Sequence, residues 1–306
     1  MSKNIAVILT GFALALATVE AQVETGSARG QQALDRARSA PISPAAPETV
    51  DVLVGSGKGF KEILILEEED KWWSINVDTG WDSLYMFRGV NLLGNGHGLY
   101  WLGGDVSVSP WEGGSITAGV WWGTGLGVTY DELNVFVDLT QSFGNFDASF
   151  GWVYYYYPND FGAGGPDIHQ NELYWALAYN AEIGAISITP SVTYYLNVGP
   201  TSQQRDGWTK PGASYLIFQL DTEIPVTDFL SFEPFTAFGV NFDFNERDNG
   251  DYFKGGNNWE LGLAMPVALT SWFTVSPYVA YSYQWQDLVG TDTNTWWAGV
   301  SASFSF

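Results

Sequence analysis

The sequence predicts an all-β fold, a transmembrane antiparallel up-and-down β-barrel of about twelve strands with a short N-terminal periplasmic extension. Three observations predict it. Apolar and polar residues alternate with period two in segments of about 10 to 15 residues from Trp72 onward. Short turns alternate with longer polar loops, which is the plan of outer-membrane barrels. Aromatic residues gather at the segment ends, where the interfacial girdles of such barrels lie.

The first 71 residues differ from the rest in composition. Lys3, the apolar run over residues 5–16 and the small residues before Gln22 predict a signal peptide over residues 1–21. Residues 22–71 are rich in Ala, Pro, Ser and Arg over much of their length and are interpreted as a periplasmic linker or extension. The barrel is predicted over residues 72–306.

The alternating segments and their connections define the predicted strands. Their approximate centres are Asp78, Gly104, Ala118, Phe136, Gly151, Trp175, Ser191, Gln219, Ala237, Leu263, Val279 and Val300. Short turns are predicted at 111–114, 144–145, 182–185, 227–228 and 270–271. Longer loops are predicted at 89–98, 123–131, 158–169, 198–212, 245–258 and 287–295. The same alternation would suit a secreted β-sandwich, but the aromatic strand ends, the acidic polar faces and the signal peptide favour the membrane barrel.

The chain ends in the middle of a strand pattern, on WWAGVSASFSF. Its apolar residues would face lipid and its serines the lumen, with Phe306 at the periplasmic rim. The ending resembles the C-terminal assembly signal of outer-membrane proteins, which implies the barrel assembly machinery as a partner through the Phe306 strand. An even number of strands places both termini in the periplasm.

Charge and composition exclude several classes of partner. The formal net charge is -22, which argues against nucleic acid. No Cys is present, so a disulfide framework and a thiolate metal site are excluded. We expect no cofactor and no metal site. The expected partners are outer-membrane lipid, lipopolysaccharide and small solutes, with the protein a monomer.

Three stretches are more specific than a barrel pattern. They are LYMFRGVNL (84–92), DELNVFVDLTQSFGNFDASFGWVYYYYP (131–158) and NELYWALAY (171–179). Together they resemble the TorF family of outer-membrane proteins, also called Gcw_chp, over roughly Trp72 to the C-terminus. The resemblance implies a signal peptide and a barrel that opens with a Phe-Arg-Gly motif. The long N-terminal extension and the absence of Cys depart from the family pattern, and the family implies no established substrate.

The polar faces of the predicted strands carry mostly acidic charge. The predicted lumen-lining residues are Asp78, Arg88, Asp105, Glu132, Asp138, Asp147, Glu172, Asp221, Glu223, Glu233, Asp243 and Glu260. From Trp72 onward there are five basic residues, and of these only Arg88 lies at a strand end. An acidic lumen must hold water and counterions, and rings of Asp and Glu favour cations. The alternative is that Arg88 and waters join the acids into a closed plug.

Aromatic side chains are also expected on the inward faces, where they could narrow the lumen or stack on a sugar or a base. These are Trp101, Trp121, Phe136, Tyr155, Tyr157, Tyr174, Tyr195 and Trp297.

The sequence therefore predicts a passive, cation-preferring diffusion channel for small solutes. The alternative is a non-conducting structural or surface-binding barrel of the envelope, and a hydrolase is a third. The chain is expected not to be an enzyme, because its only histidines, His97 and His169, fall in predicted loops without a neighbouring nucleophile. The polar loop at 245–258 lacks the ligand spacing of a calcium loop.

Overall fold

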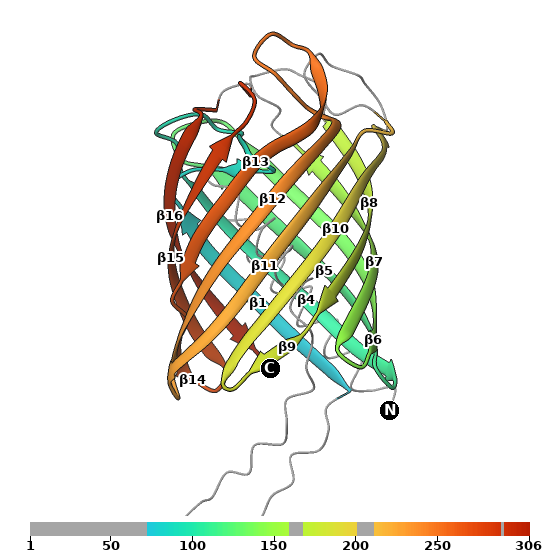
Figure 1. Cartoon of the computed structure of the whole chain (residues 1–306), viewed down its shortest axis with the longest axis vertical. Coiled ribbons are helices and arrows are strands. Elements are labelled where there is room, and N and C mark those ends of the chain that lie inside the picture. The colour runs from blue at the N-terminus through green and yellow to red at the C-terminus, as the bar shows by residue number, and fades with distance from the viewer. Residues whose placement is uncertain (1–71, 159–167, 201–210, 289–290) are drawn as a thin grey trace, which may run out of the picture.

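The computed structural model describes residues 72–158, 168–200, 211–288 and 291–306. The predicted signal peptide (1–21) and extension (22–71) lie outside these residues, as do most of the loops at 158–169 and 198–212. Within the described residues, twelve long antiparallel strands close into one barrel (Figure 1). The predicted fold class is confirmed.

The barrel wall follows the order of the chain. Its long strands are β1 (Trp73–Asp82), β4 (Leu99–Trp111), β5 (Gly114–Gly125), β6 (Asp131–Phe143), β7 (Phe146–Tyr157), β8 (Ile168–Tyr179), β10 (Ile186–Pro200), β11 (Ser214–Thr227), β12 (Leu230–Glu246), β13 (Tyr252–Ala264), β15 (Phe273–Gln284) and β16 (Asn294–Ser305). The short strands β9 (Ala181–Ile183) and β14 (Val267–Thr270) pair with β10 and β15. Every predicted strand centre falls inside one of the long strands.

The barrel closes where the first strand meets the last. β1 pairs with β16 in antiparallel register, with Asn76 opposite Ser305 and Trp81 opposite Val300. This pairing leaves no free edge between the two ends of the barrel sequence, as closure requires for a sheet surrounded by lipid. We call the end where β1 begins and β16 finishes the terminus end, and the opposite end the loop end (Figure 1).

Strand alternation separates an apolar exterior from a polar and aromatic interior. On β6, Glu132, Asn134 and Phe136 are buried, whereas Val137 and Leu139 are more than two-fifths exposed. The other exposed apolar residues along the wall include Phe150, Trp175, Leu177, Phe218, Leu261, Val279 and Val300. An exposed apolar band of this extent suits lipid contact and not water. The described residues contain no helix that is long and apolar enough to cross a membrane.

One predicted loop is wrong. Residues 245–258 were expected to form a long connection, but β12 continues to Glu246 and β13 begins at Tyr252. The connection is therefore short, and Gly255, Gly256 and Asn258 are strand residues paired with β12. These positions look like a loop in sequence because they are small and polar. Asn258 faces the interior, where its Oδ1 accepts a hydrogen bond from the Tyr215 hydroxyl at 2.8 Å.

A small hairpin lies between the first two wall strands. It consists of β2 (Met86–Phe87) and β3 (Val90–Asn91), with Phe87 paired to Val90. Its two turn residues both have positive φ, 48° at Arg88 and 83° at Gly89, the pattern of a type I′ turn. An Arg in the left-handed region costs about 1–2 kcal/mol. We call residues 84–93 the inner hairpin, because its side chains enter the barrel.

Interior glycines make room for the interior aromatic rings. In five cross-strand pairs, a Cβ added to the glycine would come within 2.1–2.5 Å of the ring opposite. The pairs are Gly80–Trp101, Gly119–Phe136, Gly151–Tyr174, Gly262–Phe235 and Gly299–Tyr278. Each ring therefore lies flat across its neighbouring strand and fills the space that the glycine leaves.

This packing predicts the effect of adding one methyl group. We expect Gly151→Ala to destabilise the barrel by about 1–3 kcal/mol, because the ring of Tyr174 must leave its position. The measurement is the urea midpoint of the refolded protein in detergent. Gly104→Ala is the matched control, since its Cβ would meet only the Asn76 carbonyl oxygen, at 3.5 Å. Equal effects of the two substitutions would contradict the account.

Candidate functional site

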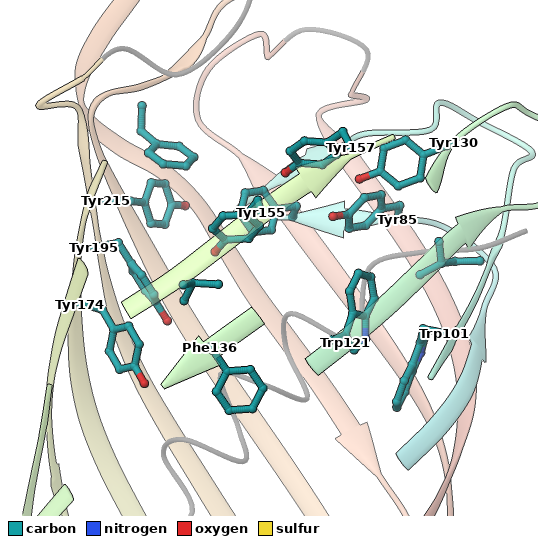
Figure 2. Packing of buried hydrophobic residues seen from close by; sticks show 14 of the residues in the cluster. Tyr85, Trp101, Trp121, Tyr130, Phe136, Tyr155, Tyr157, Tyr174, Tyr195 and Tyr215 are labelled. Carbon is teal, nitrogen blue, oxygen red and sulfur yellow. The ribbon is translucent and has the colours of Figure 1, made fainter. Parts of the chain in front are cut away.

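The interior of the barrel at the loop end is filled by aromatic side chains. Tyr85 and Phe87 of the inner hairpin pack among buried aromatic residues. Figure 2 shows Tyr85 with other members of this cluster. Those labelled in the figure are Trp101, Trp121, Tyr130, Phe136, Tyr155, Tyr157, Tyr174, Tyr195 and Tyr215. The eight aromatics expected to face inward are all buried, and Trp297 packs with Met86 in a second cluster. The inner hairpin thus constricts the lumen at this end.

The tip of the inner hairpin carries a buried ion pair. The Arg88 guanidinium donates from Nη1 to Glu172 Oε1 at 2.7 Å and from Nη2 to Oε2 at 2.8 Å, a bidentate geometry. Both side chains are at most 2% exposed. Tyr155 and Gln170 also donate to the Glu172 carboxylate, at 2.8 and 2.9 Å. Burial lowers the pKa of Arg88, but the charge and hydrogen bonds of Glu172, together with Tyr155 and Tyr195, raise it by more, so the pKa lies above its ordinary value.

Aromatic rings surround the same guanidinium. The Arg88 Cζ lies 4.0 Å from the ring centroid of Tyr195, 4.5 Å from Phe244 and 5.7 Å from Tyr215. These distances are typical of cation–π contacts, which strengthen when water is excluded. We call Glu172, Tyr195, Tyr215 and Phe244 the Arg88 cage. All four belong to the barrel wall, on β8, β10, β11 and β12.

The backbone at the hairpin tip is held as firmly as the side chain. The Arg88 carbonyl oxygen accepts hydrogen bonds from Asn257 Nδ2 at 2.9 Å, Asn245 Nδ2 at 3.0 Å and the Tyr215 hydroxyl at 3.2 Å. A Cβ at Gly89 would lie 2.6 Å from Asn257 Nδ2. Gly89 therefore allows both the turn and the close approach of the hairpin to β13.

A second carboxylate holds the base of the inner hairpin. The hydroxyls of Tyr85 and Tyr130 both donate to Glu132 Oε2, and Asn134 Nδ2 donates to Oε1 at 2.7 Å. Burial, together with the Glu132 charge, raises the pKa of Tyr85 and of Tyr130 well above the usual value. Both hydroxyls therefore remain protonated donors, and Glu132 is satisfied without a cation.

Asp82 forms a third buried acidic site, which sequence reasoning missed. It is 1% exposed at the end of β1, where it accepts hydrogen bonds from Trp101 Nε1 at 3.1 Å and from the Tyr278 hydroxyl. The available signal was its even spacing from Asp78 on the same strand. Asn245 and Asn257, which donate to the Arg88 carbonyl oxygen, were also missed, because they lie in the segment interpreted as a loop.

Most of the predicted lumen residues lie on interior positions of their strands. Glu132, Asp138, Asp147, Glu172 and Glu260 are buried there. Asp78, Asp105, Asp221 and Glu233 are half-buried and Glu223 is exposed, all nearer the middle or the terminus end. Uncharged side chains donate hydrogen bonds to two of these carboxylates: Asn76 donates to Asp105 at 3.0 Å, and Gln219 donates to Asp221 at 2.6 Å. The structure gathers Glu132, Glu172 and Arg88 around the hairpin and spreads the others along the wall.

Two predicted residues lie elsewhere than expected. Arg88 is at the tip of the inner hairpin and not at the end of a wall strand. Asp243 has a φ of 60° and sits where the register of β12 shifts, so Phe244 takes the buried position. Asp243 instead pairs with Lys254 at 3.2 Å, on exposed surface at the loop end. The alternation rule fails there because the strand is irregular.

Within the described part of the chain, neither histidine is hydrogen-bonded to a Ser, a Thr or a carboxylate, and His169 Nδ1 instead contacts the Tyr154 hydroxyl. His97 Nδ1 lies 3.1 Å from the Leu126 carbonyl oxygen on exposed surface. His169 lies on the outside of β8, stacked on Tyr156 with centroids 5.0 Å apart and on Tyr154 at 5.6 Å. Among the described residues, no group of three or more potential metal ligands is present.

A closed twelve-strand barrel with an apolar exterior and a carboxylate-rich interior defines the class of this chain. It is a transmembrane β-barrel of the Gram-negative outer-membrane type.

Solved structures of several outer-membrane proteins are similar to this chain. The NanC porin has a TM-score of 0.48 at 14% identity, over 75% of this chain and 98% of its own. An outer membrane channel from Pseudomonas putida F1 has a TM-score of 0.47 at 9% identity, over 76% and 95%. The translocator domain of the autotransporter NalP from Neisseria meningitidis has a TM-score of 0.44 at 13% identity, over 79% and 91%.

No family model and no curated protein sequence matches this chain. The likeness to solved structures concerns the barrel alone, so the function of this chain rests on its own residues.

Proposed function

We propose that this protein is a passive, cation-preferring diffusion channel for small solutes in the outer membrane, constricted at its loop end by the inner hairpin. The observation that carries the proposal is the charge of the interior. Acidic side chains occupy interior positions on most of the wall strands, whereas the described basic residues outside the hairpin, Arg247 and Lys254, lie at the loop end. Rings of carboxylates attract cations and repel anions.

The half-buried acids near the middle of the barrel would set the selectivity. Asp78 and Asp105 face the interior from the neighbouring strands β1 and β4 and remain partly exposed. Asp105 lies opposite Asn76, which is two residues before Asp78. Partly exposed carboxylates stay in contact with water and can exchange counterions, which buried carboxylates cannot do. Transport by this route needs no covalent step and no cofactor.

The direct test is the reversal potential of the refolded mature chain in a planar bilayer under a KCl gradient. We expect a potential on the side of K⁺ selectivity, moved toward zero by Asp78→Asn with Asp105→Asn. Glu112→Gln in an exposed turn is the control, because it removes an equal kind of charge outside the lumen. A folded protein that selects anions, or that ignores the interior substitutions, would refute the proposal.

A second candidate is a non-conducting barrel that serves envelope structure or surface binding. The packed interior at the loop end favours it, since Trp101, Trp121, Tyr155 and Tyr174 are each at most 1% exposed. The same bilayer measurement separates the two: a demonstrably folded barrel without current would select this second function.

The remaining proposals follow from the interpretation of this chain as an outer-membrane β-barrel. We propose that the protein is a monomer with both termini in the periplasm, that it contacts lipopolysaccharide and outer-membrane lipid, and that the strand ending at Phe306 engages the barrel assembly machinery. Membership of the TorF family likewise stays a proposal. It is supported by the LYMFRGVNL stretch, whose Phe-Arg-Gly residues form the hairpin tip.

A further inference from the structure

We propose that the Arg88 cage is a binding site for solutes that carry a guanidinium group, and that Arg88 occupies it in the resting state as an internal stand-in for such a solute. This inference rests on the proposed channel function and deepens it, because it names a class of solute and a route by which that solute could release the constriction. The contacts, the backbone and the unused nitrogen of Arg88 each support it.

Most contacts to the guanidinium come from the wall, and Phe87 of the hairpin adds a ring at 4.7 Å from Cζ. Glu172 provides the two-oxygen acceptor, and Tyr195 and Phe244 provide ring faces at 4.0 and 4.5 Å from Cζ. Tyr155 and Gln170 also donate hydrogen bonds to the carboxylate and hold it in place. Because these groups are held by the barrel strands, the cage keeps its chemistry when the hairpin moves away. Two carboxylate oxygens between aromatic ring faces match the two parallel N–H donors of a planar guanidinium. An ammonium group is a compact charge and cannot donate in this bidentate geometry.

The cage recognises the end of the Arg88 side chain more completely than its stem. Both Nη atoms donate to Glu172. The Nε atom is buried without a hydrogen-bond partner in the described part of the chain. A guanidinium on another carrier would therefore make the same contacts to Glu172 and to the rings. It would also avoid the left-handed backbone that Arg88 must adopt, with φ of 48°.

The consequence is competition. Arg88 and a guanidinium solute cannot both occupy the cage, so a bound solute displaces the hairpin tip. Arg88 has the advantage of a high effective concentration, because it is tethered nearby. A solute wins only when abundant, which links release of the constriction to supply of the solute. An ammonium solute cannot make the bidentate contact to Glu172, so it would bind the cage much more weakly.

The test fills the cage from outside after Arg88 is removed. Full-length mature Arg88→Ala is refolded in detergent and its thermal midpoint followed in millimolar methylguanidinium chloride or methylammonium chloride. We expect a concentration-dependent rise with methylguanidinium and little change with methylammonium. Wild type should show no such rise, and neither should Arg88→Ala with Glu172→Gln. Equal shifts with the two cations, or a rise that survives the loss of Glu172, would overturn the proposal.

A second measurement uses the wild-type protein and therefore tests the proposal even if Arg88→Ala does not fold. In the wild-type protein, methylguanidinium should speed amide hydrogen exchange over residues 84–93, and methylammonium at equal concentration should not. Identical exchange in both salts would refute the cage. These readouts do not depend on current. If methylguanidinium raises the thermal midpoint but the barrel never conducts, the binding site is supported and the channel function is refuted. If the barrel carries a cation-selective current but methylguanidinium has no effect, the channel function is supported and the binding site is refuted.

Discussion

Glu172→Gln is expected to destabilise the folded barrel by about 3–5 kcal/mol, the cost of leaving a buried charge without its partner. The substitution keeps the shape of the side chain but removes the charge that holds Arg88. Both groups are at most 2% exposed, so water cannot replace the lost interaction while the hairpin stays docked. We therefore also expect the inner hairpin to detach before the wall unfolds.

The measurement is the urea midpoint in detergent together with hydrogen exchange over residues 84–93. Glu223→Gln is the matched control, since Glu223 is exposed near the terminus end and accepts from Ser231 at 3.1 Å. We expect the control to change stability by well under 1 kcal/mol. A Glu172→Gln protein as stable as the control, with a protected hairpin, would show that the ion pair does not hold the constriction.

Removing the inner hairpin is expected to raise single-channel conductance severalfold. Replacing residues 84–93 by a short Gly-Ser linker takes Tyr85, Met86, Phe87 and Leu93 out of the loop end, where each is at most 9% exposed. Each such side chain contributes about 1.5–3 kcal/mol when fully buried, so the variant should also unfold more readily. Conductance is measured in a planar bilayer, and folding is checked by heat-dependent mobility on a gel.

The control for that deletion shortens the exposed connection between β12 and β13 at residues 248–250. This change leaves the interior intact and should leave the conductance close to the wild-type value. If the hairpin deletion and the control conduct equally, the constriction is not formed by residues 84–93.

Local patterns in the sequence were sufficient for the barrel wall. Alternation such as Leu133, Val135 and Val137 against Glu132 and Asn134 sets which side of a strand faces lipid, and this depends on neighbours two residues apart. All twelve strand centres were placed correctly for that reason. The rule failed at Asp243, where a positive φ and a register shift exchange the two faces.

The inward fold of the hairpin could not be predicted in the same way. The Phe-Arg-Gly motif is visible in the sequence, but neither its turn nor its direction was predicted, because the direction depends on partners far along the chain. Arg88 meets Glu172 at a separation of 84 residues, Tyr215 at 127 and Asn257 at 169. Of these partners, only Asn257 falls in a stretch predicted as a loop. Glu172 and Tyr215 lie in or beside predicted strands, but no local pattern shows that the three together form a receptor for the hairpin.

The same separations set an order of events during biogenesis. The inner hairpin emerges early, between the first two wall strands, but its receptor is complete only when β13 has taken its place. Closing contacts over such distances is slow, because the loop entropy must be overcome first. Docking of residues 84–93 is therefore a late step, and a barrel arrested before β13 would hold this aromatic segment undocked. Protection of the hairpin thus reports that the wall has been completed.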